Sequence, residues 1–167
     1  LTLRHFAFVD SQALLKNPSI TSQLKPEFQW EIEGSLEMTA ARVVAADKAR
    51  SDWYRVLMKL FESYDFLVLP TAQVFPFSAD THWPSEINGK AMDTYHRWME
   101  VVIGGTLAGL PVVNLPVGFD SKGRPMGIQV MGPSGADKAV LEFALAYESV
   151  TSFLAQRPTL VENAKAI

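Results

Sequence analysis

One serine of this sequence lies where a catalytic nucleophile could be held. Ser134 is the middle residue of the segment 132–136 (Gly-Pro-Ser-Gly-Ala), between an apolar run and a helical pattern, which resembles the strand-to-helix turn of an α/β-hydrolase. In that fold the base histidine follows the serine, whereas every histidine of this chain precedes it: His5, His82 and His96. Ser134 and Asp137 also have the spacing of a capping box. We therefore expect Ser134 to cap a helix rather than to attack a substrate.

Two further patterns have catalytic or metal-ligand spacing. Ser22 and Lys25 match S-x-x-K, but Pro26 disfavours a helical Lys25, and no S-D-N or K-T-G segment accompanies the motif. His96 and Glu100 are four residues apart and could share one helix face. However, the chain has no H-E-x-x-H pairing, no cysteine and no phosphate-binding glycine motif. We expect no metal site and no cofactor.

The composition excludes several functional classes. The 167 residues are 48% hydrophobic and 20% charged with a net charge of −3, which is typical of one globular domain that does not bind nucleic acid. Charges interrupt the apolar groups of the first fifteen residues, and the longest apolar run, from Met99 to Leu115, is too short to span a bilayer. We expect a cytoplasmic protein without a membrane segment.

Hydrophobic periodicity predicts the elements of the first half of the chain. The first 35 residues have weak periodicity and several breakers, and are predicted as connecting structure. A long amphipathic helix is predicted from Thr39, its N-cap, to about Tyr64. The four apolar residues Phe66–Leu69 predict a short strand that is buried on both faces. Residues 72–91 have no period and are predicted as a long loop.

The second half of the chain predicts a β-hairpin between two helices. Val112–Val117 and Met126–Met131 are apolar segments joined by a turn-rich stretch, with Pro116 at an edge or a bulge. A helix of residues 93–108 would precede this hairpin, and a helix of residues 135–150 would follow it. The predicted fold is therefore α/β: part of a mixed sheet in which the hairpin supplies antiparallel strands and helices pack outside.

Several short motifs occur in order along residues 24–150. They are Leu24-Lys25-Pro26 with Trp30-Glu31, Tyr64-Asp65 through Leu69-Pro70-Thr71-Ala72-Gln73, Tyr95-His96-Arg97-Trp98-Met99-Glu100, Leu107-Ala108-Gly109-Leu110-Pro111, Asn114-Leu115-Pro116-Val117-Gly118-Phe119, Pro125-Met126-Gly127-Ile128-Gln129, and Ala146-Tyr147-Glu148. This ordered series resembles the C-terminal part of the amidase signature family, which includes aminoacyl-tRNA amidotransferase A subunits. The resemblance implies that residues 1–167 are the C-terminal portion of an amidase domain with a partial amidase-signature fold.

The resemblance also implies a chemistry. Members of this family hydrolyse the C–N bond of a carboxamide through an acyl-serine intermediate, with a triad of two serines and a lysine and without a cofactor. The Gly/Ser-rich segment and the lysine of that triad are absent from this sequence. We therefore assign no catalytic residue, and expect a substrate-channel and structural portion that is inactive alone. Its partner would be a small amide substrate of the parent enzyme.

The resemblance further implies which residues border the substrate. Thr71 lies in a Pro-Thr turn that borders the channel in relatives, and one side of the helix before the hairpin would present the others: Tyr95, Met99, Val102 and Gly105. Amidotransferase relatives have an acidic residue near the position of Met99 that holds an amino-acid substrate. Methionine there implies a more apolar substrate or none of that kind, which argues against an amidotransferase.

Two other functions are compatible with the residues. The chain could be a stand-alone, non-catalytic binding or oligomerisation module, in which exposed sheet edges and apolar surface join copies into a homo-oligomer. It could also be an unrelated serine hydrolase that uses Ser134, which predicts labelling of that serine by a fluorophosphonate.

Overall fold

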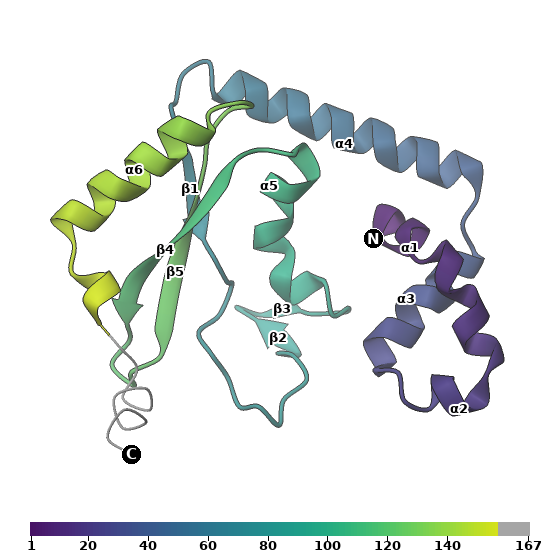
Figure 1. The fold of residues 1–167 in the computed structure, drawn as a ribbon. Coiled ribbons are helices and arrows are strands. Elements are labelled where there is room, and N and C mark those ends of the chain that lie inside the picture. Colours follow the sequence, from purple (N-terminus) through teal and green to yellow (C-terminus); the bar gives the residue numbers. More distant parts are fainter. Residues whose placement is uncertain (157–167) are drawn as a thin grey trace. The chain divides into compact units, whose positions relative to one another are not determined.

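The computed structural model describes residues 1–156 (Figure 1). The chain divides into two compact units, a first unit of Leu1–Arg55 and a second unit that begins at Val56. One helix, α4 (Ala40–Leu60), runs from the first unit into the second. No helix in the described part of the chain is both long enough and apolar enough to cross a membrane.

The first unit is helical, which corrects the expectation of connecting structure over the first 35 residues. It contains α1 (Thr2–Ala7), the 3-10 helix η1 (Val9–Lys16), α2 (Pro18–Thr21) and α3 (Pro26–Leu36). The prolines counted as breakers begin helices, because Pro18 and Pro26 each occupy the first turn, where no amide donor is needed. Lys25 accordingly has an extended backbone and lies outside α3, as Pro26 predicts.

Buried polar contacts join α1 to α3 in this unit. The Arg4 side chain donates to the Glu31 carboxylate at 2.7 Å, and that carboxylate is only 4% exposed. The ring of His5, also buried, donates from Nδ1 to the Glu31 carbonyl oxygen at 3.0 Å. Gly34 faces the same ring so closely that a Cβ there would overlap the Cε1 and Nδ1 atoms of His5.

Helix α4 confirms the long helix expected from Thr39. The Thr39 hydroxyl accepts a hydrogen bond from the amide of Arg42 at 3.3 Å, and Lys48 pairs with Asp52 at 2.8 Å, one turn along the outer face. Of the apolar side chains along this helix, only Leu57 is buried.

The second unit is built on a three-stranded antiparallel sheet in the order β1-β5-β4. Its strands are β1 (Leu67–Pro70), β4 (Val112–Phe119) and β5 (Pro125–Met131), and the predicted hairpin is β4–β5. The expectation that the strand after α4 is buried on both faces was wrong. That strand, β1, is an edge strand with alternating burial, so that Val68 is 45% exposed. Pro116 was predicted to lie at an edge or a bulge, and the structure shows both: β4 is an edge strand, and its register shifts between Pro116 and Phe119.

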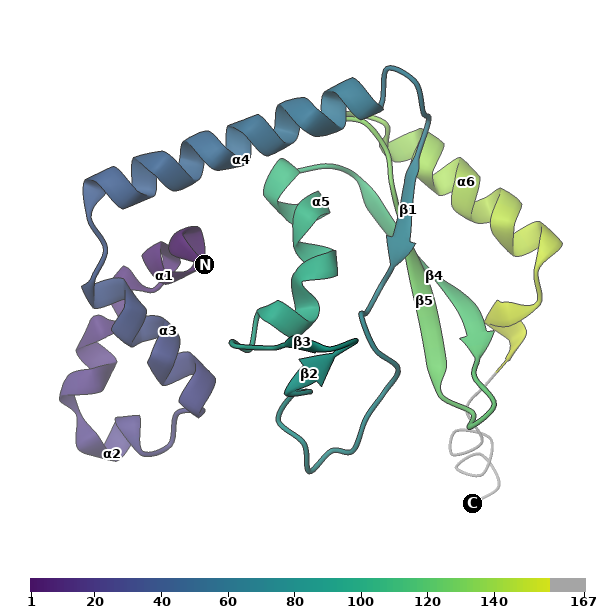
Figure 2. The same ribbon diagram turned by 180° about the vertical axis from the view of Figure 1, so that it is seen from behind.

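Helix α6 (Asp137–Val150) covers part of this sheet, as Figure 2 shows from behind. Val140 and Ala144 are its buried residues, and Ala144 joins Leu115 and Val130 in the core. The helix confirms the prediction for residues 135–150, but the capping box does not form. Its N-cap is Ala136 without a side-chain hydrogen bond, so the predicted capping role of Ser134 was wrong.

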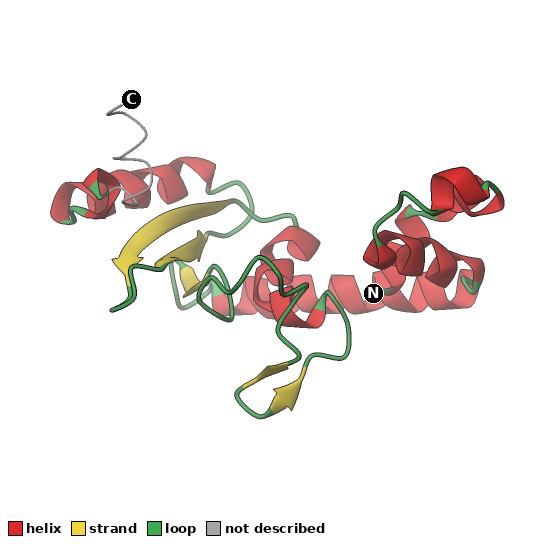
Figure 3. Ribbon diagram, turned by 90° about the horizontal axis from the view of Figure 1, so that it is seen from below, coloured by secondary structure: helices red, strands yellow, loops and turns green. Residues whose placement is uncertain are grey.

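The stretch predicted as one helix over 93–108 is shorter and has two parts. It begins as the 3-10 helix η2 (Arg97–Val102) and continues as α5 (Ile103–Ala108). Gly109 ends α5 in the left-handed conformation, with φ 65°, as predicted for a glycine C-cap. Part of the predicted loop before η2 is a two-stranded ribbon, β2 (Glu86–Ile87) and β3 (Lys90–Ala91), which stands apart from the larger sheet in Figure 3.

Candidate substrate-binding site

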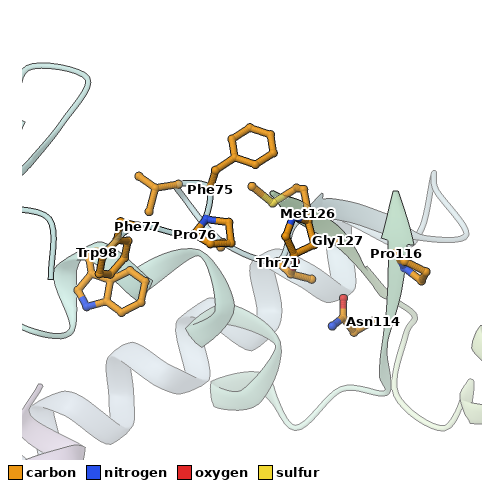
Figure 4. Close-up of a pocket in the computed structure, with 12 residues that line it drawn as sticks. Thr71, Phe75, Pro76, Phe77, Trp98, Asn114, Pro116, Met126 and Gly127 are labelled. Carbon is orange, nitrogen blue, oxygen red and sulfur yellow. The ribbon is translucent and has the colours of Figure 1, made fainter. Parts of the chain in front are cut away.

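The second unit contains a cavity of about 460 Å³ beside the β4–β5 hairpin, where the chain leaves β1. Four stretches of chain line it: the segment that leaves β1, one residue of η2, two positions on β4, and the first residues of β5 (Figure 4). The lining residues are Thr71, Ala72, Val74, Phe75, Pro76, Phe77, Trp98, Asn114, Pro116, Pro125, Met126 and Gly127. A volume of this size is typical of sites for small molecules.

Most of the cavity wall is apolar, and none of its lining side chains carries a charge. Phe75 and Phe77 come from the segment after β1, and Met126 comes from β5. The ring of Phe77 meets the indole of Trp98 edge to face, with 5.5 Å between centroids. These side chains form a wall suited to an aromatic or alkyl group.

The polar part of the cavity is where Thr71 and Asn114 converge on Gly127. The Thr71 amide donates to the Gly127 carbonyl at 3.0 Å, which fixes the start of the lining segment against β5. A Cβ added to Gly127 would lie 2.8 Å from Thr71 Oγ1 and 2.9 Å from Asn114 Oδ1. The space beside Gly127 therefore exists because the residue has no side chain, and a hydroxyl and an amide border it. Each of these groups can both donate and accept a hydrogen bond.

Two glutamines hold η2 against the sheet beside this cavity. Gln129, which is 4% exposed on β5, donates from Nε2 to the carbonyl oxygens of Pro70 at 2.8 Å and Val101 at 2.9 Å. Gln73 accepts from the Val101 amide at 3.0 Å and donates to the Arg97 carbonyl at 3.3 Å. These contacts hold the backbone on both sides of Trp98, at Arg97 and Val101, and so place Trp98 opposite the lining segment.

The five residues predicted to border the substrate are not brought together. Thr71 lines the cavity, whereas Tyr95 does not and instead packs behind Trp98. The centroid of the Tyr95 ring lies 6.2 Å from that of Trp98 and 5.8 Å from that of Trp83. Tyr95 also precedes the first turn of η2, so the expected helical spacing does not apply to it.

The other three of these residues lie along η2 and α5 without lining this cavity. Met99 is partly buried and Val102 is 39% exposed. Gly105 packs against the sheet, since a Cβ there would lie 2.8 Å from Cγ2 of Val112 and 3.0 Å from Sδ of Met131. Side chains of β4 and β5 therefore approach the backbone closely at this glycine. Contact of the five residues with a substrate stays a prediction.

Most of the cavity lining was not selected from the sequence. Two signals pointed to it. The prolines beside aromatic residues in the segment 72–91 marked a loop that differs from a plain connection, and Gly127 interrupts an apolar strand, which often marks a close approach. Asn114 had no signal of its own, because an asparagine inside a strand is recognisable only once its neighbours are known.

The remaining candidates do not form a reactive cluster in the part of the chain that the structure describes. Ser134 is exposed, and neither it nor any of the three histidines lines the cavity. Residues 1–156 contain no group of three or more side chains arranged to hold a metal ion. His96 lies outside η2, as its N-cap, so the helical spacing of His96 and Glu100 does not hold.

Known proteins resemble this chain in both sequence and fold. A family model described as Amidase matches residues 8–141. A fatty acid amide hydrolase of Medicago truncatula is 30% identical over 161 residues, which cover 92% of this chain and 26% of the relative. The A subunit of the glutamyl-tRNA(Gln) amidotransferase of Symbiobacterium thermophilum is 38% identical over 120 residues, covering 71% of this chain and 23% of the relative. The chain thus spans about a quarter of the length of these curated relatives.

Solved structures show the same fold. A bacterial aryl acylamidase of the amidase signature enzymes family superposes with a TM-score of 0.77 at 22% identity, over 87% of this chain and 31% of that one. A 6-aminohexanoate cyclic dimer hydrolase superposes with a TM-score of 0.73 at 18% identity, over 96% of this chain and 35% of that one. These findings confirm the α/β class, with partial coverage of the amidase-signature fold. Because the Amidase family model matches most of the length of this chain, the chain belongs to the amidase family.

Proposed function

We propose that this chain supplies a substrate-binding wall of an amidase that cleaves the C–N bond of a neutral amide with an apolar substituent. The observation that carries the proposal is the cavity itself, in which an aromatic wall faces two uncharged hydrogen-bonding side chains, Thr71 and Asn114. The phenyl or alkyl part of the substrate would lie against Phe75, Phe77 and Trp98. Its carboxamide would exchange hydrogen bonds with Thr71 and Asn114.

Charge selects between amides and their related acids at this site. A carboxylate placed in the cavity would lose water without gaining a cationic partner from any lining side chain, which disfavours the acid relative to the neutral amide. A carboxamide loses less on transfer, and Thr71 and Asn114 offer it both a donor and an acceptor.

The bond-breaking step would be made by groups outside this sequence. The resemblance to the amidase signature family implies attack by a serine, departure of the amine and hydrolysis of the acyl-serine, with a lysine drawing the proton through a second serine. The 167 residues hold no Gly/Ser-rich segment of that kind. We therefore expect this chain to bind amides and to be inactive alone.

Titration of the purified 167-residue chain with phenylacetamide and phenylacetate tests the binding. Calorimetry should give about tenfold tighter binding of the amide, because the acid must desolvate a charge. Neither ammonia nor phenylacetate should be released from the amide over hours. Equal affinity for both probes would overturn the assignment to neutral amides, and steady ammonia release would overturn the expectation of inactivity.

Two variants place the binding in the cavity. Gly127→Ala should weaken phenylacetamide binding about tenfold, because the new methyl group fills the space between Thr71 and Asn114 and also lies 3.1 Å from the Leu115 carbonyl oxygen. Met126→Leu, at the preceding lining position, conserves volume and should change the affinity less than about threefold. An unchanged affinity in Gly127→Ala would show that the amide binds elsewhere.

A second function, a self-associating module, is favoured by the exposed edges of the sheet. Strand β1 has Val68 45% exposed and β4 has Val112 42% exposed, and α6 exposes Leu141 and Leu145. Pairing of such edges and faces would join copies of the chain into a homo-oligomer. Analytical ultracentrifugation across a hundredfold range of protein concentration tests this second function. A molar mass that stays at that of a single chain would rule out self-association.

A further inference from the structure

The turn of the β4–β5 hairpin is organised around Asp120. Its carboxylate accepts from the amides of Lys122 and Arg124, each at 2.9 Å, and from the Arg124 side chain through Nε at 2.8 Å. The second terminal nitrogen of Arg124 lies 2.6 Å from the same carboxylate. Gly123 takes the left-handed conformation, with φ 73°, that closes the turn. Two nitrogens of the guanidinium, Nε and Nη2, therefore contact one oxygen of this carboxylate, Oδ2, which restrains the orientation of the 40% exposed arginine side chain.

From this fixed position Arg124 reaches the cavity wall on a segment far away in the sequence. Its remaining terminal nitrogen, Nη1, donates to the carbonyl oxygen of Pro76 at 3.3 Å. The guanidinium carbon lies 5.2 Å from the centroid of the Phe75 ring, over its face. Phe75 and Pro76 both line the cavity, and this stretch of the wall has no helix or strand of its own. One side chain thus holds both the backbone and the ring of the wall.

The geometry does not suit Arg124 to bind a charged ligand. Hydrogen bonds from its side chain and amide hold the pKa of Asp120 below its usual value, so the carboxylate stays ionised and neutralises the guanidinium. The arginine is absent from the cavity lining, although the residue after it, Pro125, is part of that lining. Arg124 can instead position the cavity wall. Its planar guanidinium packs over the Phe75 ring, and its Nη1 group donates to the Pro76 carbonyl oxygen.

We propose that Arg124 is a positioning residue that fixes the Phe75–Pro76 wall and so sets which apolar groups the cavity accepts. The hairpin turn, through this one side chain, then determines specificity for the apolar substituent. Asp120 takes part indirectly by orienting the guanidinium. This inference rests on the proposed function only where it concerns ligand affinity; the restraint of the wall holds whether or not the cavity binds amides.

Two measurements on Arg124→Gln test the proposal. The first is the rate at which chymotrypsin cuts the Phe77–Ser78 bond, relative to its cut after the exposed Tyr64 in the same molecule. Loss of the restraint should raise this ratio about fivefold. The second is the affinity for phenylacetamide compared with that for hexanamide. The affinity for phenylacetamide should fall about fivefold and that for hexanamide less than twofold. The difference is expected because an alkyl chain does not need a fixed ring face to pack against.

Three further variants separate positioning from charge and from folding. Arg124→Lys keeps the charge next to Asp120 but lacks the planar fork, so it should resemble Arg124→Gln rather than the parent protein. Asp120→Asn should give a smaller change in the same direction. Arg55→Gln, which removes an exposed cation paired with Asp52 on α4, is the matched control and should change neither readout.

The outcomes are distinct from those of the proposed function. An unchanged cleavage ratio in Arg124→Gln, or parent-like values of Arg124→Lys in both readouts, would overturn the positioning role. A raised cleavage ratio in Arg124→Gln, together with an equal loss of affinity for phenylacetamide and hexanamide, would overturn the claim that Arg124 sets the selection between aromatic and alkyl groups. If the parent protein binds neither amide, the proposed function fails, and the cleavage ratio alone still decides whether Arg124 restrains the wall.

Discussion

Replacement of Gln129 by glutamate should destabilise the second unit by about 3–5 kcal/mol. The amide nitrogen of Gln129 donates to the carbonyl oxygens of Pro70 and Val101, and the side chain is nearly fully buried. A carboxylate cannot donate, so both carbonyls would lose the hydrogen bond from residue 129, and a negative charge would face two negative dipoles. Urea unfolding followed by tryptophan fluorescence measures the loss.

Gln73→Glu is the matched control for this variant. Gln73 uses its oxygen to accept from the Val101 amide, and a carboxylate keeps that bond while losing only the donation to the Arg97 carbonyl. Its cost should be about 1 kcal/mol. Lowering the pH should restore part of the stability of Gln129→Glu, because the protonated side chain is neutral and can donate one hydrogen bond. Equal losses in the two variants, or no recovery in acid, would show that Gln129 does not join β1, β5 and η2 as described.

The substitution Gly34→Ala should destabilise the first unit by about 2 kcal/mol, although alanine favours a helix by about 1 kcal/mol over glycine. The new methyl group would overlap two ring atoms of His5, Cε1 and Nδ1, and would lie 2.8 Å from its Cγ. The ring cannot move away cheaply, because it is buried and donates to the Glu31 carbonyl oxygen. Thermal unfolding followed by circular dichroism in the far ultraviolet measures the change.

A double-mutant cycle with His5→Ala isolates the cause of this loss. Removing the ring costs packing and one hydrogen bond, but in that background Gly34→Ala no longer meets an obstacle, so it should stabilise the chain by up to about 1 kcal/mol. The sign of the Gly34→Ala effect therefore reverses between the two backgrounds. If Gly34→Ala were equally destabilising without His5, the contact between α1 and α3 would not be its source.

The parts of the fold that could be predicted from sequence are those with strong local signals. The β4–β5 hairpin, α4 and α6 follow from periodicity and turn chemistry. The helices of the first unit were missed because Pro18 and Pro26 were counted as breakers, whereas at a first helical turn proline is favoured. The burial of the strand Leu67–Pro70 could not be known either, because an apolar run does not reveal whether its strand is central or at an edge.

The candidate site was less predictable for a physical reason. Its residues become neighbours only through pairings between distant segments, such as Thr71 with Gly127. Thr71 was found because the resemblance placed the Pro-Thr turn at the channel. Trp98 and Asn114 depend on how η2 and β4 approach that turn, and neither approach has a local signal. A sequence pattern can predict that a strand exists, but the facing of two side chains across a cavity depends on tertiary packing.

The separation in sequence between β1 and its partner strand has a kinetic consequence. The β4–β5 hairpin closes across a short turn, from Phe119 to Pro125, and can form early. Strand β1 pairs with the same β5 only when Pro70 meets Ile128, and closing that longer loop costs about 2 kcal/mol more in chain entropy. Because the lining segment continues directly from β1, we expect the cavity to be completed at a late step of folding. A nascent or partly unfolded chain can therefore possess the hairpin while still lacking the binding wall.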